Sequence, residues 1–404
     1  MRLRHPGGTL VHLAYCTNVH PAEDLAGILA QLDTYAARVR AHLNAGLPEV
    51  GLPEAGVLDG GVLGLGLWLA APVAAELAAD PALRARLRRE LSVRGLETVT
   101  LNGFPYRAFH APVVKHAVYR PDWTDRLRLR YTLDLATVLT DLLPEQAARG
   151  SVSTLPFGWR TPWGAAQASA CAGLLDELTA GLARLHRDSG RPVRVALEPE
   201  PGCVVETTEQ AVAAMSAVDG SYLGVCIDLA HLACAWEDPG QTVARLAAAG
   251  IPVVKVQVSA ALEVADPASA APVLASYAEP RFLHQTRTRS GLGFDDLPEA
   301  LAAGAEGPWR VHFHVPLHAD PTPPLATTVP LLRAGLAALL AGPVGPACDH
   351  FEVETYTWSV LPAGRRPAGE GGLAAGIAAE LAFARDEMLS LGLRPEPTRT
   401  GVHP

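Results

Sequence analysis

VRVALEP (residues 193–199) is a mostly apolar run with a carboxylate, Glu198, at its exit, and two similar runs follow it at intervals of about 30 residues. They are LGVCIDL (223–229) and PVVKVQV (252–258). Unbroken apolar runs are typical of strands that are covered on both faces. The helical patterns between them would return the chain to begin each new strand in the same direction. This part of the sequence therefore predicts a parallel sheet flanked by helices.

The same alternation extends over most of the chain. A doubly wound sheet and a closed barrel both fit it, but no GxGxxG turn follows the first strand, which disfavours a dinucleotide-binding sheet. We therefore predict a (β/α)8 TIM barrel. The other strand candidates are at 10–16, 63–70, 98–104, 151–156, 281–287, 309–315 and 350–356, and helical patterns are at 21–43, 162–185 and 371–392.

Ten strand candidates exceed the eight places of such a barrel. We assign 281–287 and 309–315 to an insertion of about 262–345 near the barrel mouth, between the last two barrel strands, where they would pair as a hairpin. The expected organisation is a single domain over 1–393 and a flexible C-terminal tail over 394–404. Segments rich in glycine and proline predict loops at 44–62 and 318–330.

Composition narrows the class of protein. The chain has 404 residues, of which 49% are hydrophobic and 19% charged, so it can bury a large core. A formal net charge of −9 argues against a nucleic-acid partner, because phosphate neutralisation needs basic surface. Neither a signal-peptide pattern nor a run of 18 apolar residues occurs, so we expect a cytoplasmic protein without membrane insertion, free to form a homo-oligomer. Six scattered cysteines without a CxxC pair predict buried free thiols.

Acidic residues mark the ends of several strand candidates. Glu198 and Glu200 end the first quoted run, Asp228 ends the second, and Glu354 lies in the last strand candidate. In a TIM barrel the carboxyl ends of the strands form the reaction face, so these side chains should meet at one rim. Carboxylates that converge in a poorly solvated cleft repel one another. A divalent cation relieves that repulsion, and oxygen ligands favour Mn²⁺, Mg²⁺ or Co²⁺ over Zn²⁺.

Not every member of this rim has a single interpretation. Glu198 and Glu200 point the same way along a strand, so either could be the ligand. Gln257 is a neutral ligand candidate, and Lys255 shares its face of the strand. His231 follows Asp228 by three residues and could carry a proton or lie behind a ligand.

Two further groups suggest a small-molecule pocket. His312 and His314 form an HxH pair on one face of a predicted strand, where they could chelate a metal, bind hydroxyl groups or pack in the core. Tyr15, Asn18 and Asn102 lie at the exits of N-terminal strands. Aromatic and amide side chains at a barrel mouth are typical of a polyol pocket, in which amides pair with hydroxyls.

The motifs together resemble a known family. AYCTNVHPAED, LNGFPY, VKHAVYRPDW, STLPFGW, LEPEPG, IDLAH, VQVSAAL, HFHVPLH and VETYTWSVLP are similar to the EboE-type metabolite traffic proteins, a branch of the xylose isomerase-like TIM barrels of the sugar phosphate isomerase and epimerase type. The resemblance covers about residues 10–392. It implies a xylose isomerase-like barrel and an association with clusters for the trafficking or maturation of secondary metabolites.

The resemblance also implies site residues. The superfamily's metal ligands fall on Glu198, Asp228, Gln257 and Glu354, with Glu198 and Glu354 as the catalytic acids. The seventh-strand ligand is usually histidine in the epimerases, so Gln257 departs from the pattern and leaves room for His312 or His314. Substrate contacts are expected from His231, Glu200, Lys255, His312, His314, Tyr15, Asn18 and Asn102.

Two functions follow from these observations. The first is a metal-dependent isomerase or epimerase, or a related lyase, that acts by proton transfer on a polyol- or cyclitol-like metabolite. The second is a protein that binds or traffics such a metabolite on the same barrel without turning it over, because a barrel can keep a pocket without the chemistry.

Overall fold

The protein is described by a computed structural model over residues 1–45, 58, 61–216, 218–342 and 345–396. Eight parallel strands of this described part close into a barrel, because β14 pairs with both β8 and β2. The predicted TIM barrel is therefore confirmed. The barrel strands are β2 (Leu10–Cys16), β3 (Leu63–Trp68), β4 (Leu96–Asn102), β5 (Gly150–Thr154), β6 (Val193–Leu197), β7 (Leu223–Asp228), β8 (Val253–Val258) and β14 (His350–Val353).

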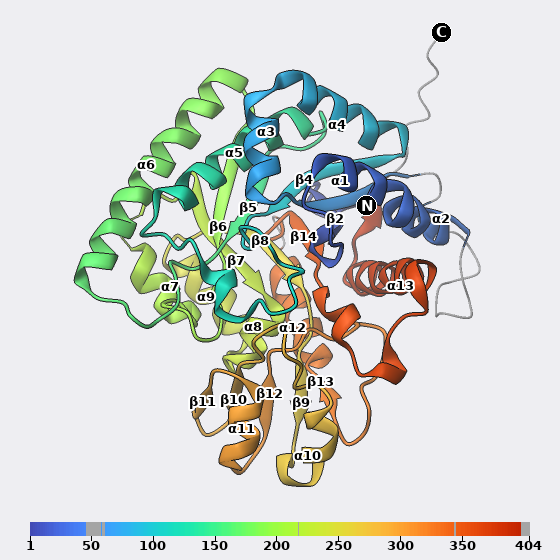
Figure 1. The fold of residues 1–404 in the computed structure, drawn as a ribbon. Coiled ribbons are helices and arrows are strands. Elements are labelled where there is room, and N and C mark those ends of the chain that lie inside the picture. Colours follow the sequence, from blue (N-terminus) through green and yellow to red (C-terminus); the bar gives the residue numbers. More distant parts are fainter. Residues whose placement is uncertain (46–57, 59–60, 217, 343–344, 397–404) are drawn as a thin grey trace.

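Helices form the outer layer around these strands (Figure 1). Almost every residue of the barrel strands is buried, as expected for strands covered on both faces. Side-chain caps set several helix starts: Asp80, Asp125 and Asp238 each accept a hydrogen bond from a backbone N–H of the first turn that follows. The helices around the barrel are α1 (Leu25–Gln31), α2 (Ala37–Ala45), α3 (Ala71–Ala79), α4 (Pro81–Val93), α5 (Arg126–Leu142), α6 (Ala165–Ser189), α7 (Thr208–Met215), α8 (Leu229–Cys234), α9 (Pro239–Ala248), α12 (Val329–Leu340) and α13 (Gly369–Ser390).

A second, small sheet lies between β8 and β14 in the chain and projects from one end of the barrel in Figure 1. Its strand order is β11-β10-β12-β9-β13, and the neighbouring strands pair antiparallel. α12, which follows it, packs on α9 in the outer layer of the barrel. The elements are β9 (Leu262–Val264), α10 (Pro267–Ala275), β10 (Thr286–Thr288), β11 (Gly293–Phe294), α11 (Leu297–Ala303), β12 (Trp309–Val311) and β13 (Ala326–Thr327).

The strand candidates at 281–287 and 309–315 are shorter in the structure than the sequence predicts. β10 and β12 pair antiparallel, with Thr286 opposite Val311, but residues 312–316 leave the small sheet and are not in a strand. Other loops satisfy part of their backbone: His312 N–H donates to Gln285 O, and Val315 N–H donates to Ala260 O. His312 and His314 therefore lie on a segment beside the barrel mouth.

Three loop or tail predictions have mixed outcomes. The predicted loop at 318–330 contains the short strand β13 and the first residues of α12. Most of the predicted loop at 44–62 lies outside the described residues. Arg394 and Pro395, expected to begin a flexible tail, form β15, which pairs antiparallel with β1 (Arg2–Arg4), and residues 397–404 lie outside the described part.

An ion pair fills the barrel interior. Lys255 Nζ on β8 lies 2.6 Å from Glu352 Oε2 on β14, and both side chains are fully buried. Gly66 on β3 leaves the space that Glu352 occupies, because a Cβ built at Gly66 would lie 1.1 Å from Glu352 Oε1. The glycine is therefore required here by close approach and not by backbone conformation.

We predict that Gly66→Ala destabilises the protein by about 3–5 kcal/mol, because the methyl group must displace Glu352 and leave the Lys255 ammonium buried without its partner. Urea unfolding measures the change. Gly173→Ala is the matched control: Gly173 is an exposed position of α6 where an added Cβ meets no atom, so it should be neutral or stabilising by up to about 1 kcal/mol. Equal unfolding free energies for the two variants would contradict this account.

Candidate active site

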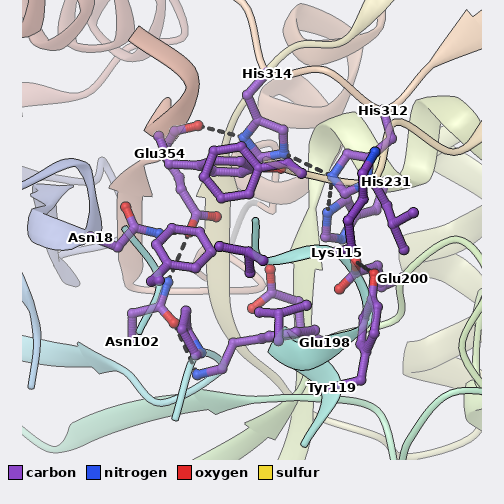
Figure 2. Close-up of a pocket in the computed structure, with 18 residues that line it drawn as sticks. Asn18, Asn102, Lys115, Tyr119, Glu198, Glu200, His231, His312, His314 and Glu354 are labelled. Atoms are coloured by element: carbon purple, nitrogen blue, oxygen red, sulfur yellow. Dashed lines mark hydrogen bonds between the residues drawn. The ribbon is translucent and has the colours of Figure 1, made fainter. Parts of the chain in front are cut away.

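A cavity opens at the carboxyl ends of the barrel strands (Figure 2). It encloses about 520 Å³ of space, including its mouth toward solvent. Carboxylates and imidazoles line it together with aromatic and aliphatic side chains. The acid–histidine cluster comprises the cavity residues Glu198, Glu354, His231, His312 and His314 together with the adjacent Asp228.

Three barrel strands deliver the carboxylates. Glu198 follows β6, Asp228 ends β7 and Glu354 follows β14. Asp228 also begins α8, where its Oδ1 accepts hydrogen bonds from the backbone N–H groups of Ala230 and His231. One oxygen of each of two acids, Glu198 Oε2 and Asp228 Oδ2, is buried and accepts no hydrogen bond. The sheet therefore brings together the acids that the sequence places at strand ends.

Burial and mutual repulsion set the charge state of these acids. Burial raises the pKa of Glu198 and Glu354 well above the usual range, and the neighbouring carboxylate of Asp228 raises both further. Burial also acts on Asp228, but the nearby imidazoles of His231 and His314 and the donated hydrogen bonds hold its pKa below the usual value. Without a cation, the cluster therefore favours protonated Glu198 and Glu354 around one ionised Asp228.

Two amides orient Glu354. Asn18 Nδ2 donates to Glu354 Oε1 at 2.7 Å, and Asn102 Nδ2 donates to the same oxygen at 2.8 Å. Both asparagines line the cavity, and the amide nitrogen of each donates to the Glu354 carboxylate. Their role in the fold is therefore to hold Glu354 in one orientation.

The three imidazoles of the cluster each have Nδ1 bonded to an acceptor. His231 Nδ1 lies 3.0 Å from Pro199 O, and His314 Nδ1 lies 2.7 Å from Glu354 O. Carbonyl oxygens accept and cannot donate, so we assign the proton of both rings to Nδ1. The Nε2 atom of each ring then carries a lone pair.

Gln285 fixes the third ring in the same way. Its Nε2 donates to Pro201 O at 2.9 Å and to Tyr119 Oη at 2.8 Å, so the amide has one orientation. Its Oε1 then accepts from His312 Nδ1 at 2.7 Å. His312 Nε2 is therefore also a lone pair. Sequence reasoning missed Gln285, although it stands next to His284 in the FLHQT stretch.

The three Nε2 atoms point at one another. The distance from His231 Nε2 to His312 Nε2 is 2.9 Å, and that from His312 Nε2 to His314 Nε2 is 3.3 Å. Burial lowers the pKa of His231 to about 4 and that of His312 well below its usual range. Neutral His231 and His312 rings in this geometry bring their lone pairs together, and a shared cation is what relieves such crowding.

The acids and the histidines of the cluster lie close enough together to share a metal ion. The donor atoms of Glu198, Asp228 and His231 lie within 4.8 Å of one another, as do those of Asp228, His314 and Glu354, and those of the three histidines. His314 Nε2 lies 3.8 Å from Asp228 Oδ2. Residues that could hold a divalent ion therefore include His314.

Glu200 lies beside this cluster and is held by a tyrosine. Tyr119 Oη donates to Glu200 Oε1 at 2.6 Å. Burial raises the pKa of Glu200 to about 8, and the hydrogen bond from Tyr119 opposes part of that rise. Glu200 lines the cavity, whereas the metal-ligand groups of the described residues contain Glu198.

Some predicted site residues lie away from the cavity. Lys255 is committed to Glu352 inside the barrel. Tyr15 Oη lies 3.2 Å from His20 Nε2, and both residues line a separate small cavity. Both amide atoms of Gln257 are buried and make no hydrogen bond, and Gln257 stands beside Asp228 in the β7–β8 register.

Glu380 of α13 braces the turn that follows Glu354. Its Oε1 accepts from Thr355 Oγ1 at 2.6 Å and from the Leu317 N–H at 3.2 Å, and its Oε2 accepts from Trp358 Nε1 at 3.2 Å. Burial raises the pKa of Glu380 to about 7, and these three hydrogen bonds oppose part of the rise.

This pKa predicts a pH dependence of stability. The folded pKa lies above the unfolded value of 4.5, so the stabilisation is complete below about pH 4.5 and is lost as the pH rises through 7. Between pH 5 and pH 8 the loss is about 2 kcal/mol. In urea unfolding, Glu380→Gln should remove this loss from the plot of unfolding free energy against pH. Glu370→Gln, an exposed position of the same helix, should keep it, and parallel profiles for Glu380→Gln and wild type would contradict the assignment.

Comparisons with known proteins agree with the fold. A family model described as "Xylose isomerase-like TIM barrel" matches residues 63–309, more than half of the chain. No match was found among curated proteins. No helix in the described part of the chain combines the length and apolar character needed to cross a membrane.

Several solved structures are similar at low identity. L-ribulose 3-epimerase is 13% identical, with 96% of this chain and 100% of that chain covered and a TM-score of 0.47. A xylose isomerase-like TIM barrel protein from Mycobacterium smegmatis in complex with magnesium is 15% identical, with 96% and 94% covered and a TM-score of 0.47. The 3-keto-D-glucoside 4-epimerase from E. coli is 12% identical, with 61% and 79% covered and a TM-score of 0.37.

Proposed function

This chain belongs to the xylose isomerase-like TIM barrel family, and on that premise we propose that it is a divalent-metal-dependent isomerase or epimerase. It acts by proton transfer on a small metabolite whose reacting part is polyol- or cyclitol-like. The resemblance of its motifs to EboE-type proteins supports a place in the trafficking or maturation of a secondary metabolite.

One observation carries the metal proposal. Two buried carboxylate oxygens, on Glu198 and Asp228, accept no hydrogen bond, and three imidazole lone pairs converge beside them. A buried hydrogen-bond acceptor without a donor costs free energy. These two oxygens and three nitrogens lie close together, so positive charge among them would stabilise the site. A divalent cation supplies that charge, and carboxylate and imidazole donors suit a first-row transition ion such as Mn²⁺ or Co²⁺.

We propose Glu198, Asp228, Glu354 and His314 as the ligands. His314 replaces the histidine that other members carry on the seventh strand, because its Nε2 and the donor atoms of Asp228 and Glu354 lie within 4.8 Å of one another. Its Nδ1–H donates to Glu354 O, which fixes the ring and keeps Nε2 available. Gln257 is the alternative fourth ligand, since its amide atoms have no other partner.

The acids carry the proton transfer. A bound ion supplies the positive charge that polarises a carbonyl group and its neighbouring hydroxyl. The Glu198 carboxylate, whose Oε2 accepts no hydrogen bond, takes the proton from the carbon next to that carbonyl and leaves an enediol-type intermediate. Glu354, held by Asn18 and Asn102, returns a proton to the opposite face of that carbon, which completes an epimerisation.

Metal content tests the proposal first. Protein purified without chelators should contain about one Mn, Co or Zn ion per chain by elemental analysis. Saturating Mn²⁺ at about 100 times its Kd should stabilise stripped protein by about 2.7 kcal/mol, because the ion binds the folded state alone. Asp228→Asn should lose this gain, whereas the exposed control Asp386→Asn should keep it. Less than about 0.2 ion per chain together with no stabilisation would refute the proposal.

A pair of variants identifies the fourth ligand. We expect His314→Ala to weaken Mn²⁺ binding by at least about tenfold and Gln257→Leu to change it by less than about threefold. Mn²⁺ titration followed by electron paramagnetic resonance measures both affinities. The reverse order would assign the place to Gln257.

Catalysis is separated from binding by two further variants. Once a substrate is identified, Glu198→Gln and Glu354→Gln should abolish its turnover, because each removes a proton carrier. A protein that only carries the metabolite would keep its ligand affinity within a few-fold in both variants and would show no turnover in the wild type.

A further inference from the structure

We propose that the substrate is amphipathic, with an oxygen-bearing head that reaches the acid–histidine cluster and an apolar body, aromatic or branched, that packs against the apolar part of the cavity lining. This inference names the substrate class of the site and rests on the proposed function. A free sugar or unsubstituted polyol, hydroxylated along its whole length, is not the ligand that this cavity fits.

Apolar side chains form a continuous part of the cavity lining, called here the apolar wall. Its members come from the loop after β4 and the segment before β10. Two of their rings contact each other and Tyr356: the ring centroids of Phe109 and Phe282 are 5.1 Å apart, and that of Tyr356 lies 5.4 Å from Phe109 and 4.9 Å from Phe282. The apolar wall comprises Phe104, Phe109, Val114, Val118, Phe282 and Leu283.

Several polar groups near this wall already have partners. Tyr119 Oη is shared between Glu200 and Gln285. Lys115 Nζ pairs with Asp296. The amide nitrogens of Asn18 and Asn102 both donate to Glu354. A polyol chain in this space would lose water and gain few hydrogen bonds in return, which weakens binding.

The apolar wall is built into the fold. Val114 N–H and Lys115 N–H both donate to Arg281 O, at 2.8 and 2.9 Å, and this joins the loop after β4 to the segment that carries Phe282. The buried Arg128 guanidinium donates to Gly103 O and Phe104 O at 2.7 and 3.0 Å. A surface held in this way is present before the ligand arrives, so the apolar body gains burial without the cost of ordering the wall.

The two kinds of lining set the ligand's orientation. The ligand's chelating oxygens would lie at the strand ends beside the acids, and its apolar body would pack against the rings of the apolar wall. Burying a phenyl group against such a wall strengthens binding by at least about tenfold over a methyl group.

Three hydroxamates with the same chelating head test the inference on Mn²⁺-loaded protein by isothermal titration calorimetry. Acetohydroxamate carries a methyl group, benzohydroxamate a phenyl group and gluconohydroxamate a polyol chain. We expect benzohydroxamate to bind at least about tenfold more tightly than either of the others. Affinities within threefold of one another, or tightest binding by gluconohydroxamate, would overturn the inference.

Two variants locate the effect. Phe109→Ala should reduce the advantage of benzohydroxamate over acetohydroxamate to less than about threefold. Phe383→Ala on α13, a phenylalanine outside this cavity, should keep the full advantage, and a ratio that Phe109→Ala leaves intact would count against the wall. Mn²⁺ binding is measured beforehand. If Mn²⁺ does not bind, both the proposed function and this inference are wrong. If Mn²⁺ binds but the three probes bind equally well, the inference alone is wrong.

Discussion

The site depends on one constraint: carboxylate oxygens and imidazole nitrogens that have no hydrogen-bond donor converge at the carboxyl ends of the barrel strands. Glu198 and Asp228 each present a buried oxygen that accepts nothing, and the Nε2 atoms of His231, His312 and His314 point at one another beside them. Such a cluster is costly unless positive charge enters it. Asp228 is both the last residue of β7 and the N-cap of α8. Its position in the cluster is therefore set by the strand-to-helix connection of the barrel.

Residues outside the barrel complete the arrangement. Gln285 fixes the tautomer of His312, and the segment with His312 and His314 runs back over the barrel mouth after the small sheet. His314 in turn donates to the backbone of Glu354, and Glu380 holds the turn behind it. The chain between β8 and β14 therefore supplies two imidazoles to a rim whose acids and His231 come from the barrel strands and the turns that follow them.

The sequence predicted the barrel because continuous apolar strands and intervening helices leave few alternatives, and it predicted the acids because parallel strands end at one rim. The sequence did not show which residues of a strand lie inside the barrel and which lie at its mouth. Lys255, two positions before Gln257, lies in the interior with Glu352, and Tyr15 faces His20. Orientation of Gln285 and assembly of the apolar wall depend on contacts between segments far apart in the chain, which local patterns do not encode.

Anomalous diffraction from Mn²⁺-soaked crystals at the manganese edge tests the central claim most directly. The account predicts a single strong peak bounded by Glu198, Asp228, His314 and Glu354, with donor atoms at coordination distance. A peak elsewhere on the chain, or no peak at a saturating concentration of Mn²⁺, would contradict it.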